Sequence, residues 1–528
     1  MLRHLLRTVN LFDTAKCALF LFFLAACHSK SGGGNEARGL VYYESNDPRS
    51  LDPALSTDVP TGEMVSLLFD GLTQFDPDGK LLPGLSDRWT ADKKAQRYVF
   101  HLRSGVMFHD GHPFVAADVR RSFLRVLNPA THGGRLWPLL PIAGAQDYAD
   151  GRALGVRGIE LLGDTAVVFT LTQPLAVFPK FLAMPVAAIV PANIAPDFGQ
   201  RPIGTGPWRF VAWEHDDYLR FARNQSYWGP PGPARSESLT VRIVPEPLTR
   251  AAEFLAGRLS VAEIPFGETV KWEHEHADWL HRKAALRVVY VALNNRRGPL
   301  HDPNVRRAIN HAVNVPEILS TVWNSRGLAA AGSIPPALGG SDPRRRPYSY
   351  DTTEARRLLR VAGYPDGFAL QLWRSGSNVE LGRVAQALQA QLATVGIRVE
   401  IISRDASSMR EAARKGETDM ALLDWWADYP DADNFLYPLF SSASFGSGGN
   451  VSFYSDPVTD SLILAARRTA DQRAREALYR RIDERVYSAA PWIYLWFPID
   501  LWAAQPSLDG WDVPVIFNGQ RWTKAHLK

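Results

Sequence analysis

The sequence predicts a multidomain protein of the α/β class. The chain has 528 residues, more than a single hydrophobic core normally contains, so two or three domains are expected. The fold class follows from an alternation of apolar strands and helices between residues 367 and 423. The composition is typical of a globular protein, because 46% of the residues are hydrophobic and 22% are charged.

The alternation consists of five consecutive segments. Residues 368–373 are a predicted apolar strand, and apolar side chains then recur at helical spacing over 384–395. Residues 397–401 form the next predicted strand, a short polar helix covers 409–415, and 420–423 form another buried strand. Units of this kind build open sheets, in which ligands bind beyond the carboxyl ends of the strands.

The rest of the chain gives further elements of both kinds. Strands are expected over 40–43 and 98–103, and helices over 64–72 and 117–127. Residues 202–208 are rich in glycine and proline, which suits a crossing between domains. They do not form a phosphate-binding loop, because no Lys followed by Ser or Thr comes after the glycines.

Residues 424–435 are the most unusual stretch of the chain. Two adjacent tryptophans and four aspartates fall within these twelve residues. Aromatic walls beside a carboxylate suit a small cationic group in a pocket, and Asp428 lies just past the end of a strand. The alternative is a strand packed by its tryptophans and followed by a solvated acidic turn. Arg374, at the carboxyl end of an earlier strand, is a second candidate for a working role.

The N-terminal segment resembles that of a lipoprotein. A basic start precedes an apolar run over 18–26, which is too short to span a bilayer and ends in Leu-Ala-Ala before Cys27. This ending resembles a bacterial lipobox, in which the cysteine becomes the acylated N-terminus. We therefore expect residues 1–26 to be a signal peptide, Cys27 to be lipidated and residues 27–38 to be a flexible tether. The alternative is an ordinary signal peptide with an incidental cysteine.

Charge and motifs argue against several other classes. The net charge of +4 comes from 59 basic and 55 acidic residues scattered along the chain, which argues against nucleic-acid binding. The sequence has neither an HExxH zinc-protease motif nor a Gly-x-Ser-x-Gly nucleophile elbow. His109 and His112 lie at a predicted turn without a third ligand, so neither a metal nor another cofactor is expected.

Six motifs along the mature chain are similar to those of one protein family. They are Ser50-Leu51-Asp52-Pro53, residues 100–111, Gly204-Thr205-Gly206-Pro207-Trp208, and residues 223–228, 302–308 and 355–364. By their number and order, the chain resembles the peptide-binding branch of the family 5 extracellular solute-binding proteins of ABC importers. The resemblance covers almost the whole mature chain.

The resemblance implies a two-lobed α/β fold of the class II periplasmic-binding-protein type, with an extra inserted domain. On the family pattern, lobe I would combine residues 39–78, 200–300 and 496–528. The inserted domain would cover 79–199 and lobe II 301–495. Ligand would bind between the two lobes as they close.

The resemblance also assigns roles to three side chains. In the family's peptide binders, the Asp of a Trp-x-x-Asp motif holds the ligand's α-ammonium. The match is Asp428, with Trp425 as a neighbouring wall. In dipeptide binders an Arg at the end of an earlier strand grips the ligand carboxylate, and Arg374 stands where that Arg is expected. Residues 375–377 differ from the expected motif, which leaves the carboxylate anchor and the peptide length open.

The implied function is that of a lipid-anchored, periplasmic or cell-surface binding protein rather than an enzyme. It would act as a monomer and hand short peptides to ABC permease subunits in the inner membrane. Other members of the family carry longer peptides, oligosaccharides or metal chelates, so these solutes remain alternatives. A secreted hydrolase is the remote alternative from another class.

Overall fold

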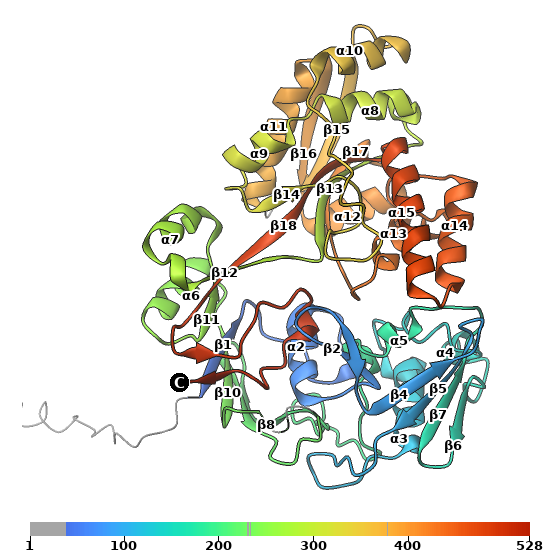
Figure 1. Cartoon of the computed structure of the whole chain (residues 1–528), viewed down its shortest axis with the longest axis vertical. Helices are drawn as coiled ribbons and strands as arrows, with labels where there is room; N and C mark the ends of the chain where they lie inside the picture. Colours follow the sequence, from blue (N-terminus) through green and yellow to red (C-terminus); the bar gives the residue numbers. More distant parts are fainter. Residues whose placement is uncertain (1–38, 230–231, 233, 377) are drawn as a thin grey trace, which may run out of the picture. The chain divides into compact units, whose positions relative to one another are not determined.

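The computed structural model describes residues 39–229, 232, 234–376 and 378–528. The predicted signal peptide, Cys27 and the tether over 27–38 lie outside these residues. The structure contains helices and strands throughout, in sheets that are antiparallel, parallel or mixed (Figure 1). The predicted α/β class is therefore confirmed.

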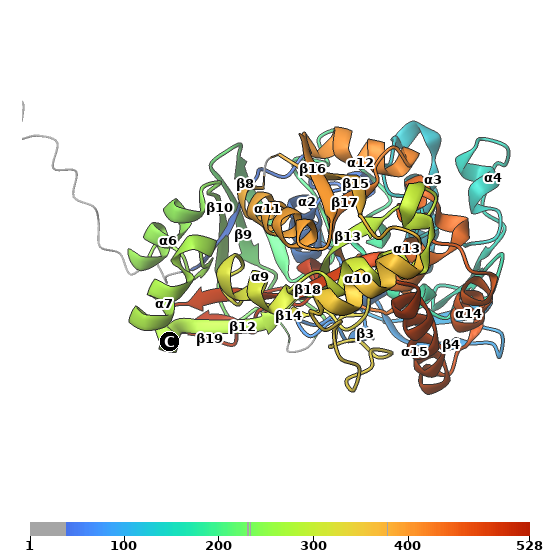
Figure 2. The same cartoon turned by 90° about the horizontal axis from the view of Figure 1, so that it is seen from above.

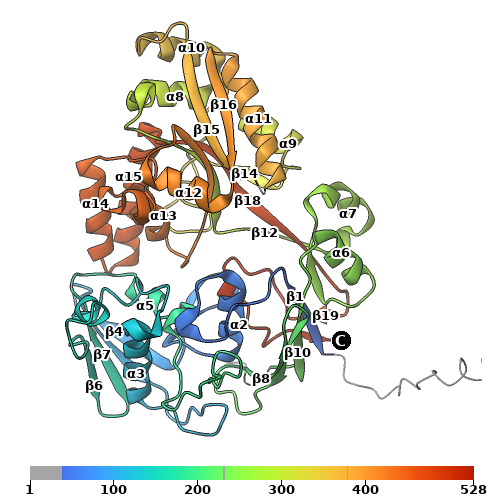
Figure 3. The ribbon, with the colours of Figure 1, turned by 180° about the vertical axis from the view of Figure 1, so that it is seen from behind.

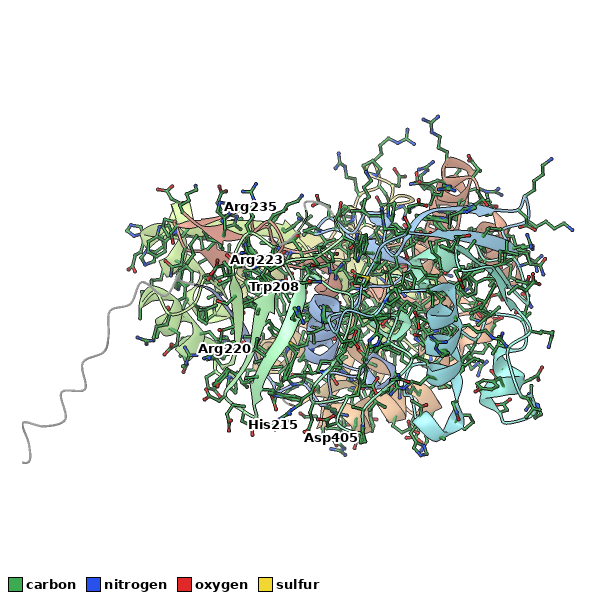
Figure 4. The ribbon with its side chains drawn as sticks, turned by 90° about the horizontal axis from the view of Figure 1, so that it is seen from below. Trp208, His215, Arg220, Arg223, Arg235 and Asp405 are labelled. Atoms are coloured by element: carbon green, nitrogen blue, oxygen red, sulfur yellow. The ribbon has the colours of Figure 1, made fainter. Side chains whose placement is uncertain are left out.

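The first sheet contains the start of the described chain. Its order is β1 (Leu40–Glu44), β10 (Ser238–Ile243), β9 (Tyr218–Arg223) and β8 (Trp208–Glu214), with β1 parallel to β10 and the other pairs antiparallel. Figure 4 labels Trp208 on β8 and Arg220 and Arg223 on β9, and Trp208 stands opposite Arg223 in the register. This sheet therefore joins residues that follow the 202–208 crossing to the first strand of the chain.

A second four-stranded sheet is antiparallel and lies within residues 79–199. Its order is β4 (Ser86–Ala91), β5 (Arg97–Leu102), β7 (Ala166–Thr170) and β6 (Ile159–Leu162). Helix α3 (Ala116–Leu127) packs its buried face, which includes Phe123, against this sheet (Figures 1 and 3). The predicted strand over 98–103 and the predicted helix over 117–127 correspond to β5 and α3.

The largest sheet is built around one long strand, β18 (Trp492–Ala504). Its order is β11 (Val261–Glu263), β18, β13 (Arg287–Leu293), β17 (Met420–Trp426), β15 (Phe368–Ser375) and β16 (Ile397–Arg404). Strands β12 (Leu280–Ala284) and β14 (Gly327–Ala329) also pair with β18 (Figure 2). Because β18 is continuous, the lobe boundary expected at residue 496 falls inside a strand.

The predicted elements between residues 367 and 423 are confirmed. Strand β15 covers 368–373, β16 covers 397–401 and β17 covers 420–423. The helices are α11 (Val379–Ala393), which packs on β15 and β16, and α12 (Ala406–Lys415). Strand β15 is parallel to both β16 and β17.

The remaining elements cover the sheets or connect them. The helices are α2 (Val59–Leu68), α4 (Ala145–Ala149), α5 (Phe178–Phe181), α6 (Pro247–Leu255), α7 (Thr269–Glu275), α8 (Pro303–His311), α9 (Val315–Thr321), α10 (Thr352–Val361), α13 (Asp433–Phe440), α14 (Pro457–Arg468) and α15 (Gln472–Ala489). The strands are β2 (Thr73–Phe75), β3 (Leu81–Pro83), β19 (Leu508–Asp509) and β20 (His526–Leu527).

The prediction of a helix over 64–72 is wrong at both ends. Helix α2 begins earlier, because the carboxylate of Asp58 accepts a hydrogen bond from the Thr61 backbone N–H at 2.9 Å and caps the helix. It ends at Leu68, four residues before the apolar pattern does. The next residue, Phe69, is already extended, and a Cβ on Gly71 would lie 2.3 Å from the carbonyl oxygen of Leu182, so this close approach requires glycine.

The carboxylate of Asp70 joins three distant segments of the chain. One oxygen accepts from the Thr205 hydroxyl at 2.8 Å and from the Trp228 indole N–H at 3.0 Å. The other accepts from the Tyr227 hydroxyl at 3.2 Å and from Arg521 at 2.6 Å. Asp70 is only 2% exposed, so these contacts replace the water that its charge would otherwise require.

The two glycines of the 204–208 motif allow the crossing to pass α2. A Cβ on Gly204 would lie 2.0 Å from the Leu68 carbonyl oxygen, and one on Gly206 would lie 2.4 Å from the Leu68 carbonyl carbon. The Gly206 N–H donates to that carbonyl oxygen at 2.9 Å. The buried His109 ring lies 3.0 Å from the Gly206 carbonyl oxygen, and burial lowers its pKa to about 4. The motif is therefore a site of close backbone packing.

We predict that Arg521→Gln lowers the free energy of unfolding by about 3–5 kcal/mol, because Asp70 would keep a buried charge without a counter-charge. Chemical denaturation followed by tryptophan fluorescence measures this loss. Arg485→Gln is the control, because it breaks an exposed ion pair with Asp456 and should cost about 1 kcal/mol or less. If the losses of Asp70→Asn and Arg521→Gln simply add in the double variant, the two side chains are not coupled.

Candidate functional site

Strand β17 continues through both tryptophans of the 424–435 stretch. The prediction ended the buried strand at Leu423, but β13 pairs with β17 along its whole length, from Leu293 opposite Met420 to Arg287 opposite Trp426. Trp425 and Trp426 are therefore the last residues of a sheet strand. Asp428 follows two residues later, between this strand and α13.

One amide side chain fixes the geometry of Trp425 and Asp428. The Oδ1 atom of Asn434, at the start of α13, accepts from the Trp425 indole N–H at 3.1 Å. The same atom accepts from the Asp428 backbone N–H at 3.0 Å. Asn434 is 3% exposed, so the strand end and the turn after it are held from inside the fold. We did not predict this residue, although its place six positions after Asp428 is visible in the sequence.

The carboxylate of Asp428 binds a cation from a distant part of the chain. Arg135 donates to Asp428 at 3.0 Å and to the Thr57 carbonyl oxygen at 3.1 Å. Gly134 lets this loop approach closely, since a Cβ there would lie 2.4 Å from the Thr57 side chain. Burial raises the pKa of Asp428, while the Arg135 charge and the hydrogen bond to Asn434 act in the opposite direction. The residue is thus a shielded carboxyl group that already holds a guanidinium.

The other aspartates of the stretch also have basic partners. Asp424 pairs with Arg287 at 2.7 Å, and Asp431 pairs with Lys180 at 2.7 Å. Asp433 lies 3.4 Å from Arg467, and its side chain is 1% exposed. The alternative of a solvated acidic turn is therefore wrong, because Asp431 and Asp433 are buried in ion pairs. These basic partners all lie outside residues 424–435, and no motif in the sequence identified them.

Arg374 lies near the end of β15 and is engaged with its own loop. Its guanidinium donates to the carbonyl oxygens of Ser375 at 2.8 Å and Asn378 at 3.3 Å. Its Nε is buried and has no hydrogen-bond partner within the described part of the chain. A Cβ on Gly382 would lie 3.2 Å from the guanidinium, so the glycine leaves room for it.

The register of β15 and β17 gives the separation of the two charged candidates. The strands are parallel, so their carboxyl ends point in the same direction. Trp373 pairs with Ala421, which places Arg374 level with Leu422, six residues before Asp428. Four of these six residues continue β17 to Trp426 and advance roughly 13 Å at about 3.3 Å per residue, and Asp428 lies beyond the strand. Arg374 lies in β15 and Asp428 follows β17 of the same sheet, so a relative movement of two lobes would leave this separation unchanged.

A hollow of about 430 Å³ adjoins the end of β17. Its lining includes Trp425, Trp426 and Asp424 from the strand, Arg410 from α12 and the glycine-rich residues 446–449. Trp425 is therefore a wall of a cavity, as an aromatic surface for a ligand requires. Asp428 is not part of this lining, since its carboxylate turns to Arg135 instead.

We predict that Arg135→Gln raises the pKa of Asp428 further, because it removes the guanidinium that counteracts burial. A ¹³C NMR titration of the side-chain carboxyl group measures the change. Because the folded-state pKa is raised, the contribution of Asp428 to stability is lost as the pH rises through that pKa, and this loss should grow in the variant. Arg152→Gln, in an exposed ion pair, is the control. An unaltered Asp428 pKa would show that the Arg135 contact does not form in solution.

The chain is similar in sequence to one family of known proteins. Residues 80–447 match the model of the bacterial extracellular solute-binding proteins, family 5 Middle. The chain is 32% identical over 457 residues to the glutathione-binding protein GsiB of Pectobacterium atrosepticum, covering 84% of this chain and 86% of that protein.

Two solved structures extend the likeness to the fold. The periplasmic binding protein DppA of Helicobacter pylori, in complex with the peptide STSA, has a TM-score of 0.75 and 30% identity, covering 92% of this chain and 98% of that chain. HbpA2 of Haemophilus parasuis has a TM-score of 0.82 and 27% identity, covering 93% of this chain and 100% of that chain. The predicted two-lobed α/β fold is confirmed by these structures.

Proposed function

Because the chain belongs to the family 5 bacterial extracellular solute-binding proteins, we propose that it captures short peptides between two closing lobes and delivers them to an ABC permease. In this proposal lobe I comprises 39–78, 200–300 and 496–528, lobe II comprises 301–495, and 79–199 is the inserted domain. Like the other members of the family, the protein acts in this proposal as the binding component of a transporter and not as an enzyme.

The observation that carries the proposal is the cation held by Asp428. A half-buried carboxylate that accepts from a guanidinium at 3.0 Å has the geometry to accept from a peptide ammonium instead. The names of the similar proteins supply the ligand class, since one binds glutathione and another was solved with a four-residue peptide. Each of these ligands is a peptide with ionised ends.

In the proposed complex Asp428 binds the peptide ammonium, Trp425 forms a wall beside it and Arg374 binds the carboxylate. Asp and Arg suit these roles because a carboxylate accepts from an ammonium and a guanidinium donates two parallel hydrogen bonds. A dipeptide separates its ends by only about 7 Å at full extension. Longer peptides separate their charged ends further, so the peptide length that suits both anchors is a result of the binding measurements below.

We predict that Asp428→Asn weakens peptide binding by about 2–5 kcal/mol, because it leaves a buried ammonium without a counter-charge. Nα-acetylation of the peptide should weaken binding to the wild type by a similar amount. Combining both changes should cost little more than either one. Isothermal calorimetry with a tripeptide and a pentapeptide measures all four combinations. C-terminal amidation with Arg374→Gln tests the second anchor in the same way.

Two results would contradict these assignments. Additive losses for Asp428→Asn and acetylation would remove the ammonium role from Asp428. Coupling at Asp428 without coupling at Arg374 would mean that the carboxylate binds elsewhere. Calorimetry with an oligosaccharide and with a metal chelate covers the alternative solutes, and product analysis after long incubation covers hydrolysis.

We also propose that Cys27 is acylated and tethers the protein to a membrane through residues 27–38. Cys27→Ser should then release the protein into the soluble periplasmic or culture fraction, because a lipoprotein's several acyl chains provide its anchor. Immunoblotting of separated membrane and soluble fractions measures this. Cys17→Ser is the matched control, since Cys17 lies inside the predicted signal peptide. A Cys27→Ser protein that stays in the membrane fraction would contradict lipidation.

A further inference from the structure

A second hollow, of about 140 Å³, lies where six segments of the chain meet. It is formed by β1, the start of α2, the end of β11, the end of β17, the second half of β18 and residues 511–522. Several of its walls are indole rings, and its polar side chains are mainly carboxyls. None of its lining residues is basic. This composition distinguishes it from the 430 Å³ hollow, whose lining includes Arg410 and Arg414.

The aromatic walls form a connected group. Trp511 lies 6.0 Å from Trp502 and 6.2 Å from Trp522, measured between ring centroids. Tyr42 lies 5.1 Å from Trp522 and extends this wall. Trp426 of β17 also lines the hollow and is 50% exposed, and the Arg287 guanidinium lies 4.7 Å from the centroid of its ring. Indole faces attract cations through their quadrupole.

The carboxyls of this hollow lack the basic partners that the other aspartates have. Within the described residues, neither Glu63 nor Asp500 forms an ion pair with lysine or arginine, and Glu263 only approaches Arg326 at 3.8 Å. Glu44 is hydrogen-bonded to Glu63; it is 6% exposed, and its Oε1 has no hydrogen-bond partner in this part of the chain. Glu63 and Asp500 are thus carboxyls without a close basic side chain in the described part of the chain, and a bound cation could supply the positive charge.

The electrostatics agree with this interpretation. Burial raises the pKa of Glu63 to about 7, and Glu44 and Tyr42 are the groups that contact it. Burial also raises the pKa of Asp500 to about 7, with Glu263 raising it and Arg287 and Arg326 lowering it. A cation placed between these carboxyls would favour their ionised forms and offset the cost of burying them.

We propose that this hollow is a cation subsite, which takes an alkylammonium or guanidinium group between the tryptophans and the carboxyls of Glu63 and Asp500. The group comes either from a basic side chain of a bound peptide or from a free organic cation. The first source rests on the proposed peptide function, whereas the second does not. The hollow has room for roughly the last four or five heavy atoms of such a group.

An inorganic ion fits this site less well than an organic cation. Calcium and magnesium require six or more oxygen ligands, whereas most of this lining is aromatic. No group of three or more His, Cys, Asp or Glu side chains among the described residues is arranged to hold a metal ion. Alkyl chains and flat guanidinium groups, in contrast, pack against indole rings while they carry their charge.

The test compares two peptides that differ only in charge, Ala-Lys-Ala and Ala-norleucine-Ala, by calorimetry at pH 8. We expect the wild type to prefer the lysine peptide about tenfold. Asp500→Asn and Glu63→Gln should each reduce this preference, and the double variant should abolish it, while affinity for the norleucine peptide stays within about twofold. Glu411→Gln removes an exposed charge from α12 and should leave the preference intact. Thermal unfolding verifies that each variant is folded.

A second arm uses butylammonium chloride without peptide, followed by tryptophan fluorescence. Saturable quenching that is lost in Asp500→Asn identifies a free organic cation as an occupant, even if neither peptide binds and the proposed peptide function fails. If the lysine peptide is preferred but butylammonium does not bind, the hollow is a subsite for a basic side chain of a bound peptide. A lysine preference that persists in the double variant would overturn the proposal. So would the lack of both a preference and butylammonium binding.

Discussion

The buried charge of Asp70 is the constraint that holds α2, residues 205–228 and the C-terminal segment together. Four donors from residues 205, 227, 228 and 521 surround this carboxylate, and they come from three segments of the chain. An unpaired buried carboxylate would be too costly to keep, so these segments have to meet at one point. Arg521 thereby fixes the C-terminal segment, which supplies Trp511 and Trp522 to the aromatic hollow.

The second constraint is the full-length pairing of β17 with β13. It carries the sheet ladder through Trp425 and Trp426, so successive side chains alternate between the faces up to the strand end. Both indoles line the larger hollow at that end, and of the two Trp426 alone also lines the smaller one. A one-residue change in this register would exchange the two faces, which makes the length of β17 a determinant of both cavities.

The local pattern of the sequence predicted the elements well where periodicity was strong. Residues 368–373, 397–401 and 420–423 all lie in strands, because apolar alternation and burial agree there. The pattern failed at Leu72, whose spacing fits a helix although Gly71 has to pass the Leu182 backbone.

The site was harder to predict than the fold, because its contacts join residues that are remote in sequence. Asp428 and Trp425 stood out through a local motif, yet Arg135 is 293 positions from Asp428 and carries no motif of its own. Likewise, the many tryptophans were visible in the composition, but only the folded chain brings Trp426, Trp502 and Trp511 around one hollow. A single sequence contains no signal for such meetings of distant segments.

The contact between Arg135 and Asp428 has a consequence for the energetics of any ligand at this carboxylate. An incoming ammonium meets a tethered competitor, whose effective concentration is in the millimolar range or above for a short connection. A free amine or a sodium ion, with no other contacts to offer, gains too little from one carboxylate to displace it. A larger ligand can exceed that threshold through its remaining contacts. The displaced guanidinium remains part of the protein, so a bound ammonium adds one positive charge to this region and the ligand's other contacts have to offset that charge as well.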